Sequence, residues 1–379
     1  MPDPLVATDA MRQYSMYGLI AYFSGKLWSV AILFVFLHTG LAARLRDEVL
    51  RKHDKLIVQV AALYTCIALS VLALYLPVHF AGDFLLERAF GFQQESLFTW
   101  LSGYVINGVL DVIPAILLLT IAFAAVRRWP QNWGLVLFGM GAPLILVASA
   151  FSGYFFDLIP FEYKPLDAGP LRTRLERLAE KAGLKDVPIL VEEASQETKK
   201  VNASTIGVGS SVRIIIFDNA IANMKEDEIE MMVAHEIGHH QMGDFWTRNC
   251  LSIAELLVLL LGAQFLAPYA VRRFPLQWGI KKVDDIAIIP AGLLAASIIS
   301  FLLLPVNGAI NKYFESRADD YALNLTGDGA AMARMLSTYA RLNLEEPDPP
   351  ALVQLWFSRH PSVRARVERA LYWQKSHSP

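Results

Sequence analysis

Long uncharged runs, rich in apolar residues, alternate with shorter polar segments over most of the chain. A helix that crosses roughly 30 Å of hydrocarbon needs about 20 predominantly apolar residues. The pattern therefore predicts about six transmembrane helices and two polar segments long enough to fold in water. The predicted spans are Leu27–Ala43, Leu56–Gly82, Ser96–Val126, Trp129–Phe156, Asn249–Val271 and Ile286–Asn311.

Two carboxylates lie inside these runs, Asp111 in the third and Glu255 in the fifth. An ionisable group at such depth usually faces the interior of a helix bundle or a water-filled cavity. A hydrogen bond between two helices would also satisfy it. Both explanations stay open at this point, and neither residue is counted among the catalytic candidates.

The polar segment after the fourth span predicts a small α/β unit. Gly169–Ala182 carries leucines at spacings of four and three, which is typical of an amphipathic helix, and Pro188–Val191 favours a short strand. Val201–Val208 and Val212–Phe217 are β-branched runs separated by Gly-Ser-Ser, a pattern that predicts a hairpin. Such a hairpin either holds an extended peptide as an added strand or serves the fold alone.

Composition agrees with a membrane protein and narrows its class. Of 379 residues, 54% are hydrophobic and 18% are charged, with a mean hydropathy of +0.37. The net charge of −2, without a basic stripe, argues against a nucleic-acid partner. Cys66 and Cys250 both fall in or beside apolar runs, so no disulfide framework is expected. No cleavable signal pattern precedes the first span, which is expected to direct insertion.

One short motif predicts the chemistry: His235-Glu236-Ile237-Gly238-His239. Residues four apart share one face of a helix, so both imidazoles can bind one metal ion with Glu236 beside it. Zinc with an open coordination position lowers the pKa of bound water to about 7, and Glu236 could then act as general base. The acidic start and apolar spacing of residues 224–234 favour a helix here rather than a chance match.

Two histidines do not complete a hydrolytic zinc site, so a third ligand must come from the same side of the membrane. Glu315 is the best candidate, on a polar helix, Lys312–Leu325, that continues from the sixth span. Asp319 follows one turn later on the same face, where it could hold the second nitrogen of a ligand imidazole. A solvated helix face is the alternative, but the upstream motif favours a site for one Zn²⁺ per chain.

These residues resemble the integral-membrane zinc metalloproteases that include the type I CAAX prenyl protease and the bacterial heat-shock protease HtpX. The resemblance runs from about residue 15 to about residue 370. It is carried by His-Glu-Ile-Gly-His at 235–239, the Glu315–Asp319 segment, Asn202-Ala203 with the strand Arg213–Asp218, Ser358-Arg-His360-Pro361 with Arg366, and Gly91-Phe92-Gln93-Gln94.

The resemblance implies roles for the site residues. By that likeness His235, His239 and Glu315 bind zinc, and Glu236 is the base. Helices surrounding a large water-filled chamber are also implied. The edge strand would hold substrate backbone, and an imidazole and a guanidinium would bind substrate or stabilise the oxyanion. The residues implied in these last two roles are Asn202 and Ala203 for the strand, and His360 and Arg366 for the donors.

For His360 and Arg366 the alternative is a structural role, as a His-Pro pair that starts a helix and as a surface arginine.

The expected fold is a mainly α, polytopic membrane protein with about six transmembrane helices and a zincin-like α/β catalytic domain carrying a small β-sheet. The expected segments are 1–157 with helices one to four, 158–248 with the hairpin and motif helix, 249–311 with helices five and six, and 312–379 with the third ligand.

The expected function is membrane-embedded, zinc-dependent endopeptidase activity on membrane, misfolded or CAAX-like peptide substrates, with the lipid bilayer as the other partner. The alternative is a non-catalytic scaffold or transporter that retains a zinc site, although the chain lacks the related halves typical of transporters. The chain has fewer predicted spans than eukaryotic prenyl proteases and more than HtpX-type members, which indicates a prokaryotic relative of the prenyl protease branch.

Orientation rests on two opposed arguments. Loops on the side away from the polar segments carry 11 Lys and Arg, against 9 near the span ends on the polar side. The positive-inside rule then favours an extracytoplasmic site. The family resemblance implies a zinc site that faces the cytoplasm, and we adopt that orientation, with the bacterial inner membrane as the expected location.

Overall fold

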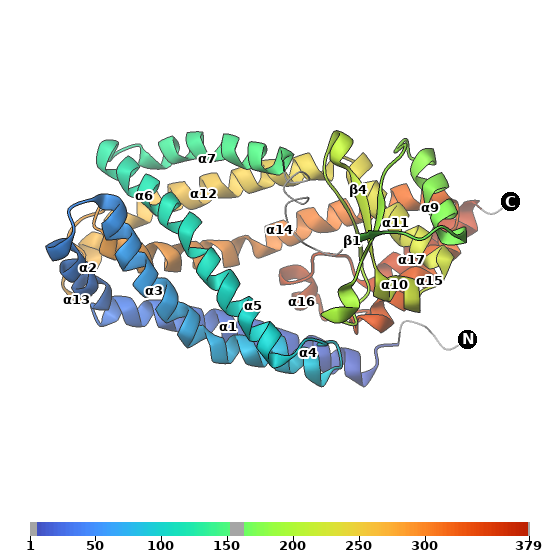
Figure 1. The fold of residues 1–379 in the computed structure, drawn as a ribbon, viewed down its shortest axis with the longest axis horizontal. Coiled ribbons are helices and arrows are strands. Elements are labelled where there is room, and N and C mark those ends of the chain that lie inside the picture. The colour runs from blue at the N-terminus through green and yellow to red at the C-terminus, as the bar shows by residue number, and fades with distance from the viewer. Residues whose placement is uncertain (1–5, 152–162, 378–379) are drawn as a thin grey trace.

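The computed structural model describes residues 6–151 and 163–377 and is mainly helical. Within these residues, six helices are long and apolar enough to cross a membrane. They form one end of the molecule, and a small sheet with its helices forms the other (Figure 1). The predicted fold class is confirmed. The spans are α1 (Asp9–His38), α3 (Leu56–His79) with η1 (Phe80–Leu85) and α4 (Leu86–Ala89), α5 (Leu97–Leu110) with α6 (Val112–Arg128), α7 (Trp133–Ala150), α12 (Asp244–Arg273), and η4 (Ile286–Ile288) with α14 (Ile289–Thr326).

The structure corrects the bounds of the first predicted span, Leu27–Ala43. The helix begins much earlier, at Asp9, where the Thr8 side chain accepts a hydrogen bond from an amide of the first turn. It ends at His38, and the nearby Gly40 adopts a left-handed conformation with φ of 64°. The prediction required an uncharged run and therefore stopped at Lys26, although residues 13–25 before it carry no charge and belong to the same helix.

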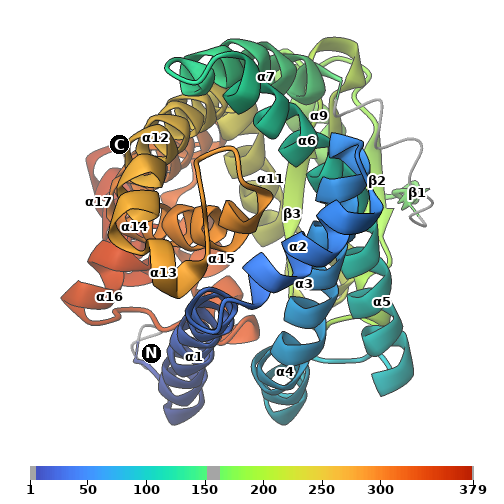
Figure 2. The ribbon, with the colours of Figure 1, turned by 90° about the vertical axis from the view of Figure 1, so that its left-hand side faces the viewer.

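The six spans form a closed ring. Each contacts its two neighbours in the order α1, α3, α6, α7, α12, α14 and back to α1. Figure 2 looks along the spans and shows this ring end-on. The predicted end of the fourth span at Phe156 and the segment boundary at 157 lie outside the described residues.

Both intramembrane carboxylates line cavities. Asp111 lines one between α3, α5 and α14, and Glu255 lines another between α1, α12 and α14. Neither side chain makes a hydrogen bond or ion pair with another described residue. The cavity-lining explanation is therefore the one that the structure favours.

A four-stranded sheet begins the polar half, in the order β1-β2-β4-β3. β2 and β4 are parallel, and the other two pairs are antiparallel. The predicted hairpin is confirmed, because β3 pairs with β4 across a turn in which Gly207 and Gly209 have positive φ. β3 is one of the two edge strands, with β1 at the other edge. The bounds are β1 (Tyr163–Pro165), β2 (Ile189–Glu192), η2 (Ala194–Gln196), β3 (Ala203–Ile206), η3 (Gly209–Ser211) and β4 (Arg213–Phe217).

Helix α11 (Glu226–Gln241) is the centre of the polar half. Its buried side chains include Ile229, Val233 and Ile237, and it contacts β3, α14 and four further helices. Because α14 runs unbroken from the ring to Thr326, it joins both halves of the molecule. The remaining helices are α2 (Leu41–Lys52), α9 (Pro170–Lys181), α10 (Asp218–Asn223), α13 (Pro275–Trp278), α15 (Gly329–Leu342), α16 (Ala351–Trp356) and α17 (Val363–His377).

The segment Gly91–Gln94 ties the ring to the chain just before β3. It exchanges backbone hydrogen bonds with residues 197–199 in an antiparallel bridge. Beside this bridge, the Lys200 ammonium lies 2.8 Å from Glu87 and donates to the Tyr14 hydroxyl at 2.7 Å. These contacts fix the position of the edge strand relative to α1 and α4.

Candidate metal centre

The two motif histidines lie on one face of α11 and turn toward α14. The ring centroids of His235 and His239 are 4.8 Å apart. Gly238 lets the two helices approach, because a Cβ at this position would lie 3.0 Å from the carbonyl oxygen of Ala318. This close crossing brings Glu315, nearly one turn earlier on α14, opposite the imidazoles.

The three candidate ligands fit a tetrahedral metal ion. Nε2 of His235 is 3.2 Å from one Glu315 oxygen, and Nε2 of His239 is 3.4 Å from the other. Zinc with bonds of about 2.0 Å to nitrogen and oxygen holds its ligand atoms about 3.3 Å apart. Oε2 of Glu315 is buried and makes no hydrogen bond within the described residues. A buried carboxylate oxygen without a donor is what a missing cation would satisfy, so the residues fit a zinc ion.

A further carboxylate orients each imidazole. Nδ1 of His235 lies 2.9 Å from Asp319, and Nδ1 of His239 lies 2.8 Å from Asp244. Protons on both Nδ1 atoms leave the Nε2 lone pairs directed into the site. Asp244 was not predicted from the sequence. Its signal was the Gly243-Asp244 pair directly after the motif helix, where Gly243, with φ of 70°, turns the chain back into α12.

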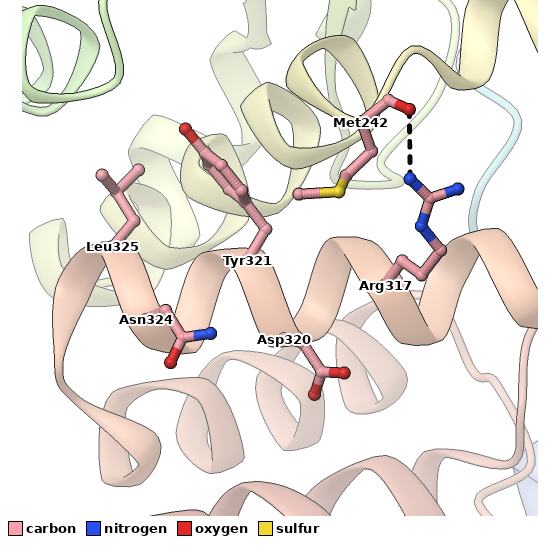
Figure 3. A pocket seen from close by; sticks show the side chains of 6 residues that line it. All are labelled: Met242, Arg317, Asp320, Tyr321, Asn324 and Leu325. Carbon is pink, nitrogen blue, oxygen red and sulfur yellow. Dashed lines mark hydrogen bonds between the residues drawn. The ribbon is translucent and has the colours of Figure 1, made fainter.

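Two arginines hold these carboxylates in place. Arg317 donates to the backbone carbonyl of Met242 at 3.1 Å, as Figure 3 shows, and lies 3.6 Å from Asp244. Arg366 donates to both oxygens of Asp319, at 2.7 and 2.8 Å, from α17. The side chain of Arg366 is 12% exposed, and its Nε and Nη2 both donate to this carboxylate. Arg366 therefore holds the group that orients His235.

The electrostatics of the site follow from burial and these carboxylates. Burial alone would lower the pKa of His235, but the adjacent carboxylates of Asp319 and Glu315 raise it to about 9. The same negative charge would favour a metal cation at Nε2. Burial raises the pKa of Glu236 above its usual range, although the two nearby imidazoles act to lower it. Burial would lower the pKa of Arg366, but Asp319 raises it, so the guanidinium is charged.

His360 stands at the open side of the cluster. Its Nε2 is 3.5 Å from Oε2 of Glu315, and 49% of the side chain is exposed. It comes from the turn between α16 and α17, so three segments far apart in sequence meet here: α11, α14 and this turn. An exposed imidazole beside the ligand atoms is free to meet a bound molecule.

The edge-strand candidates lie apart from the cluster. Asn202 directly precedes β3, its side chain is exposed, and its carbonyl accepts a hydrogen bond from the Phe217 amide. Ala203 is the first residue of β3, with its side chain buried at 4% exposure. No hydrogen bond or ion pair among the described residues joins either one to the site. Ala203 can therefore offer a ligand only backbone groups.

Two family models cover most of the chain. The model of peptidase family M48 matches residues 165–374, which include every candidate metal ligand. The model described as CAAX prenyl protease N-terminal, five membrane helices, matches residues 6–157. Four of the six apolar spans lie in this second region.

Similar proteins agree with this match. The uncharacterized metalloprotease YhfN of Bacillus subtilis is 23% identical over 95% of this chain and 84% of its own length. CAAX prenyl protease 1 of Saccharomyces cerevisiae is 24% identical over 77% of this chain and 67% of its own length. The crystal structure of S. mikatae Ste24p shares the fold, with a TM-score of 0.82 at 19% identity over 95% of this chain and 88% of that one. The chain therefore belongs to peptidase family M48 and is an integral-membrane metalloprotease.

Proposed function

We propose that the chain is an endopeptidase that holds one Zn²⁺ between His235, His239 and Glu315. The observation that carries this proposal is the buried, unsatisfied Oε2 of Glu315, which lies 3.2 Å from a ligand nitrogen. When bound, zinc supplies a Lewis acid that polarises the scissile carbonyl and acidifies a water molecule. Segments 158–248 and 312–379 are proposed to build the centre, and segments 1–157 and 249–311 are proposed to carry the membrane spans.

Glu236 is the proposed general base. It follows a ligand histidine directly on α11, so its carboxylate lies beside the centre without being one of the three ligands. In hydrolysis it would take a proton from the attacking water and later give it to the leaving amine. The upward pKa shift from burial suits this role, because the carboxylate must hold the proton between the two steps.

The remaining site residues are proposed to bind and orient the substrate. The free edge of β3 suits an added strand, with Asn202 and the backbone of Ala203 as contacts. His360, half exposed beside the ligands, would donate to the oxyanion that develops on the scissile carbonyl. Arg366 is proposed to act through Asp319, by fixing the carboxylate that orients a ligand histidine.

Zinc dependence tests this function. We expect the protein, purified in detergent, to cleave internally quenched peptides and to lose this activity on treatment with a chelator. Zinc at one equivalent per chain should restore cleavage, because two imidazoles and one carboxylate form a zinc-type donor set. Magnesium, which prefers oxygen ligands, is the control and should not restore it. Full activity after complete metal removal would exclude the proposed chemistry.

The proposed substrates are membrane, misfolded or CAAX-like peptides. The similar proteins include prenyl proteases and an HtpX homologue from Aeropyrum pernix, 24% identical over 56% of this chain and 63% of its own length. The similarity to a Bacillus subtilis protein over 95% of this chain supports a bacterial cell membrane, the inner one where there are two, as the proposed location.

We propose that the active site faces the cytoplasm. The sheet and the C-terminal helices lie at one end of the spans (Figure 1), so one reporter at the C-terminus reports the side of the metal centre. We expect a green fluorescent protein fused there to fluoresce and an alkaline phosphatase fused there to be inactive. Both reporters inserted in the loop at residues 129–132, between α6 and α7, should give the reverse result. Active phosphatase at the C-terminus would place the site outside the cytoplasm, as the basic loops favour.

A further inference from the structure

A cavity of about 500 Å³ lies beside the proposed metal centre, between α1, α12, α14 and the segment after α16. Arg248 belongs to both places: it lines the cavity, and its guanidinium is 3.8 Å from Glu315. The lining continues along α12 from Arg248 to Glu255, and along α14 from Asn311 to Leu304. Because α12 leaves the centre while α14 approaches it, both walls lead from the centre toward the middle of the spans.

The end of the cavity nearer the centre is positively charged, and one carboxylate lies deeper. Arg248 donates to Asn311, and Arg359, the neighbour of His360, also lines the cavity. Glu255 faces the same space from two turns further along α12 and makes no hydrogen bond or ion pair with any residue that the structure describes. A carboxylate at membrane depth is costly unless it meets a partner or water.

The polar lining distinguishes this cavity from the one between α6, α12 and the start of α14. That second cavity is lined by apolar and aromatic side chains such as Phe123, Leu266 and Leu294. The cavity beside the centre has Ser252 and Asn307 in addition to its charged groups. A carboxylate among neutral polar groups, next to the site of peptide hydrolysis, is suited to a cationic group of the substrate.

We infer that Glu255 is a specificity-determining residue that binds a basic side chain of the substrate. This inference rests on the proposed endopeptidase function. The seven residues from Arg248 to Glu255 advance about 10 Å along the helix, which is the length of about three residues of extended peptide. The recognised Lys or Arg is therefore about three residues from the scissile bond, on the part of the substrate that enters the cavity.

The test uses quenched peptides that differ at one position. Each carries Lys, Gln or Glu at the second, third or fourth residue from the scissile bond, on either side, and kcat/KM is measured for each. We expect the native protein to prefer Lys over Glu by at least about tenfold at one of these positions. Glu255→Gln should reduce this ratio to about one, and Glu255→Lys should invert it. A ratio within one variant does not depend on how much of the protein is active.

Asp111→Asn is the matched control, because Asp111 is also an unpartnered carboxylate within a span but lines a different cavity. It should keep the native ratio. Equal cleavage of the Lys and Glu peptides by the native protein would overturn the inference and leave the protease function intact. An unchanged ratio in Glu255→Gln would overturn it as well. If none of the peptides is cleaved by the native protein under zinc-replete conditions, the endopeptidase proposal itself fails.

Discussion

Replacing Glu236 by Gln is expected to lower peptide hydrolysis by about 10²–10⁴-fold while zinc content stays near one ion per chain. The amide keeps the shape of the side chain but cannot take a proton from the attacking water. The ligand atoms of His235, His239 and Glu315 remain within 4.8 Å of one another without any contribution from Glu236. The two measurements are kcat/KM on a quenched peptide and metal content by mass spectrometry.

The matched control for this variant is Glu230→Gln, on the same helix. Glu230 pairs with Arg174 on the outside of the polar half, away from the metal centre. Its replacement should leave both hydrolysis and zinc content near the native values. Cleavage at the native rate by Glu236→Gln would show that another group is the base.

Glu315→Ala is expected to remove the bound metal as well as the activity. The two imidazoles alone do not make a hydrolytic zinc site, and the variant also loses the negative charge that offsets the cation. His239→Ala should behave in the same way. Asp244→Asn is expected to have a smaller effect on zinc binding. It weakens the hydrogen bond to Nδ1 of His239, so zinc affinity should fall by about 10–100-fold without loss of the site. Zinc titration in the presence of a competing chelator separates the two classes.

Asp320→Ala serves as the control for the ligand series. Asp320 is on the same helix as Glu315, but it faces Arg369 in an exposed pair. Its loss should leave zinc affinity unchanged, because an exposed pair contributes little. Retention of stoichiometric, tightly bound zinc by Glu315→Ala would contradict the proposed ligand set and require another third donor.

The local sequence pattern was enough to predict the spans and the two histidines of the metal centre. Apolar runs predict membrane helices because the bilayer demands a continuous apolar length, and the interior of each run does not depend on its neighbours. The first span shows the limit of this rule, since Lys26 interrupts the uncharged run while α1 continues through it from Asp9 to His38. His235 and His239 were predictable because four residues of one helix always place two side chains on one face.

The third ligand and the orienting groups depend on contacts between distant segments. Glu315 was proposed from its charged surroundings and from a family resemblance, whereas the structure brings it opposite the imidazoles through the close approach at Gly238. Asp244 was missed because its contact with His239 depends on the left-handed turn at Gly243, which helical spacing does not predict. Arg366 was expected to bind substrate or stabilise the oxyanion, and only its position on α17 pairs it with Asp319.

The linear order of residues already specified a membrane protein with a motif helix and a hairpin, because hydropathy and helical periodicity act over a few turns of chain. Packing alone determined that the six spans close into a ring and that α11, α14 and α17 meet around one point. It also left Glu255 unpaired in a polar cavity beside that point. The physical reason is that such groupings depend on which helix faces bury one another, a property of the whole fold that no short stretch of sequence contains.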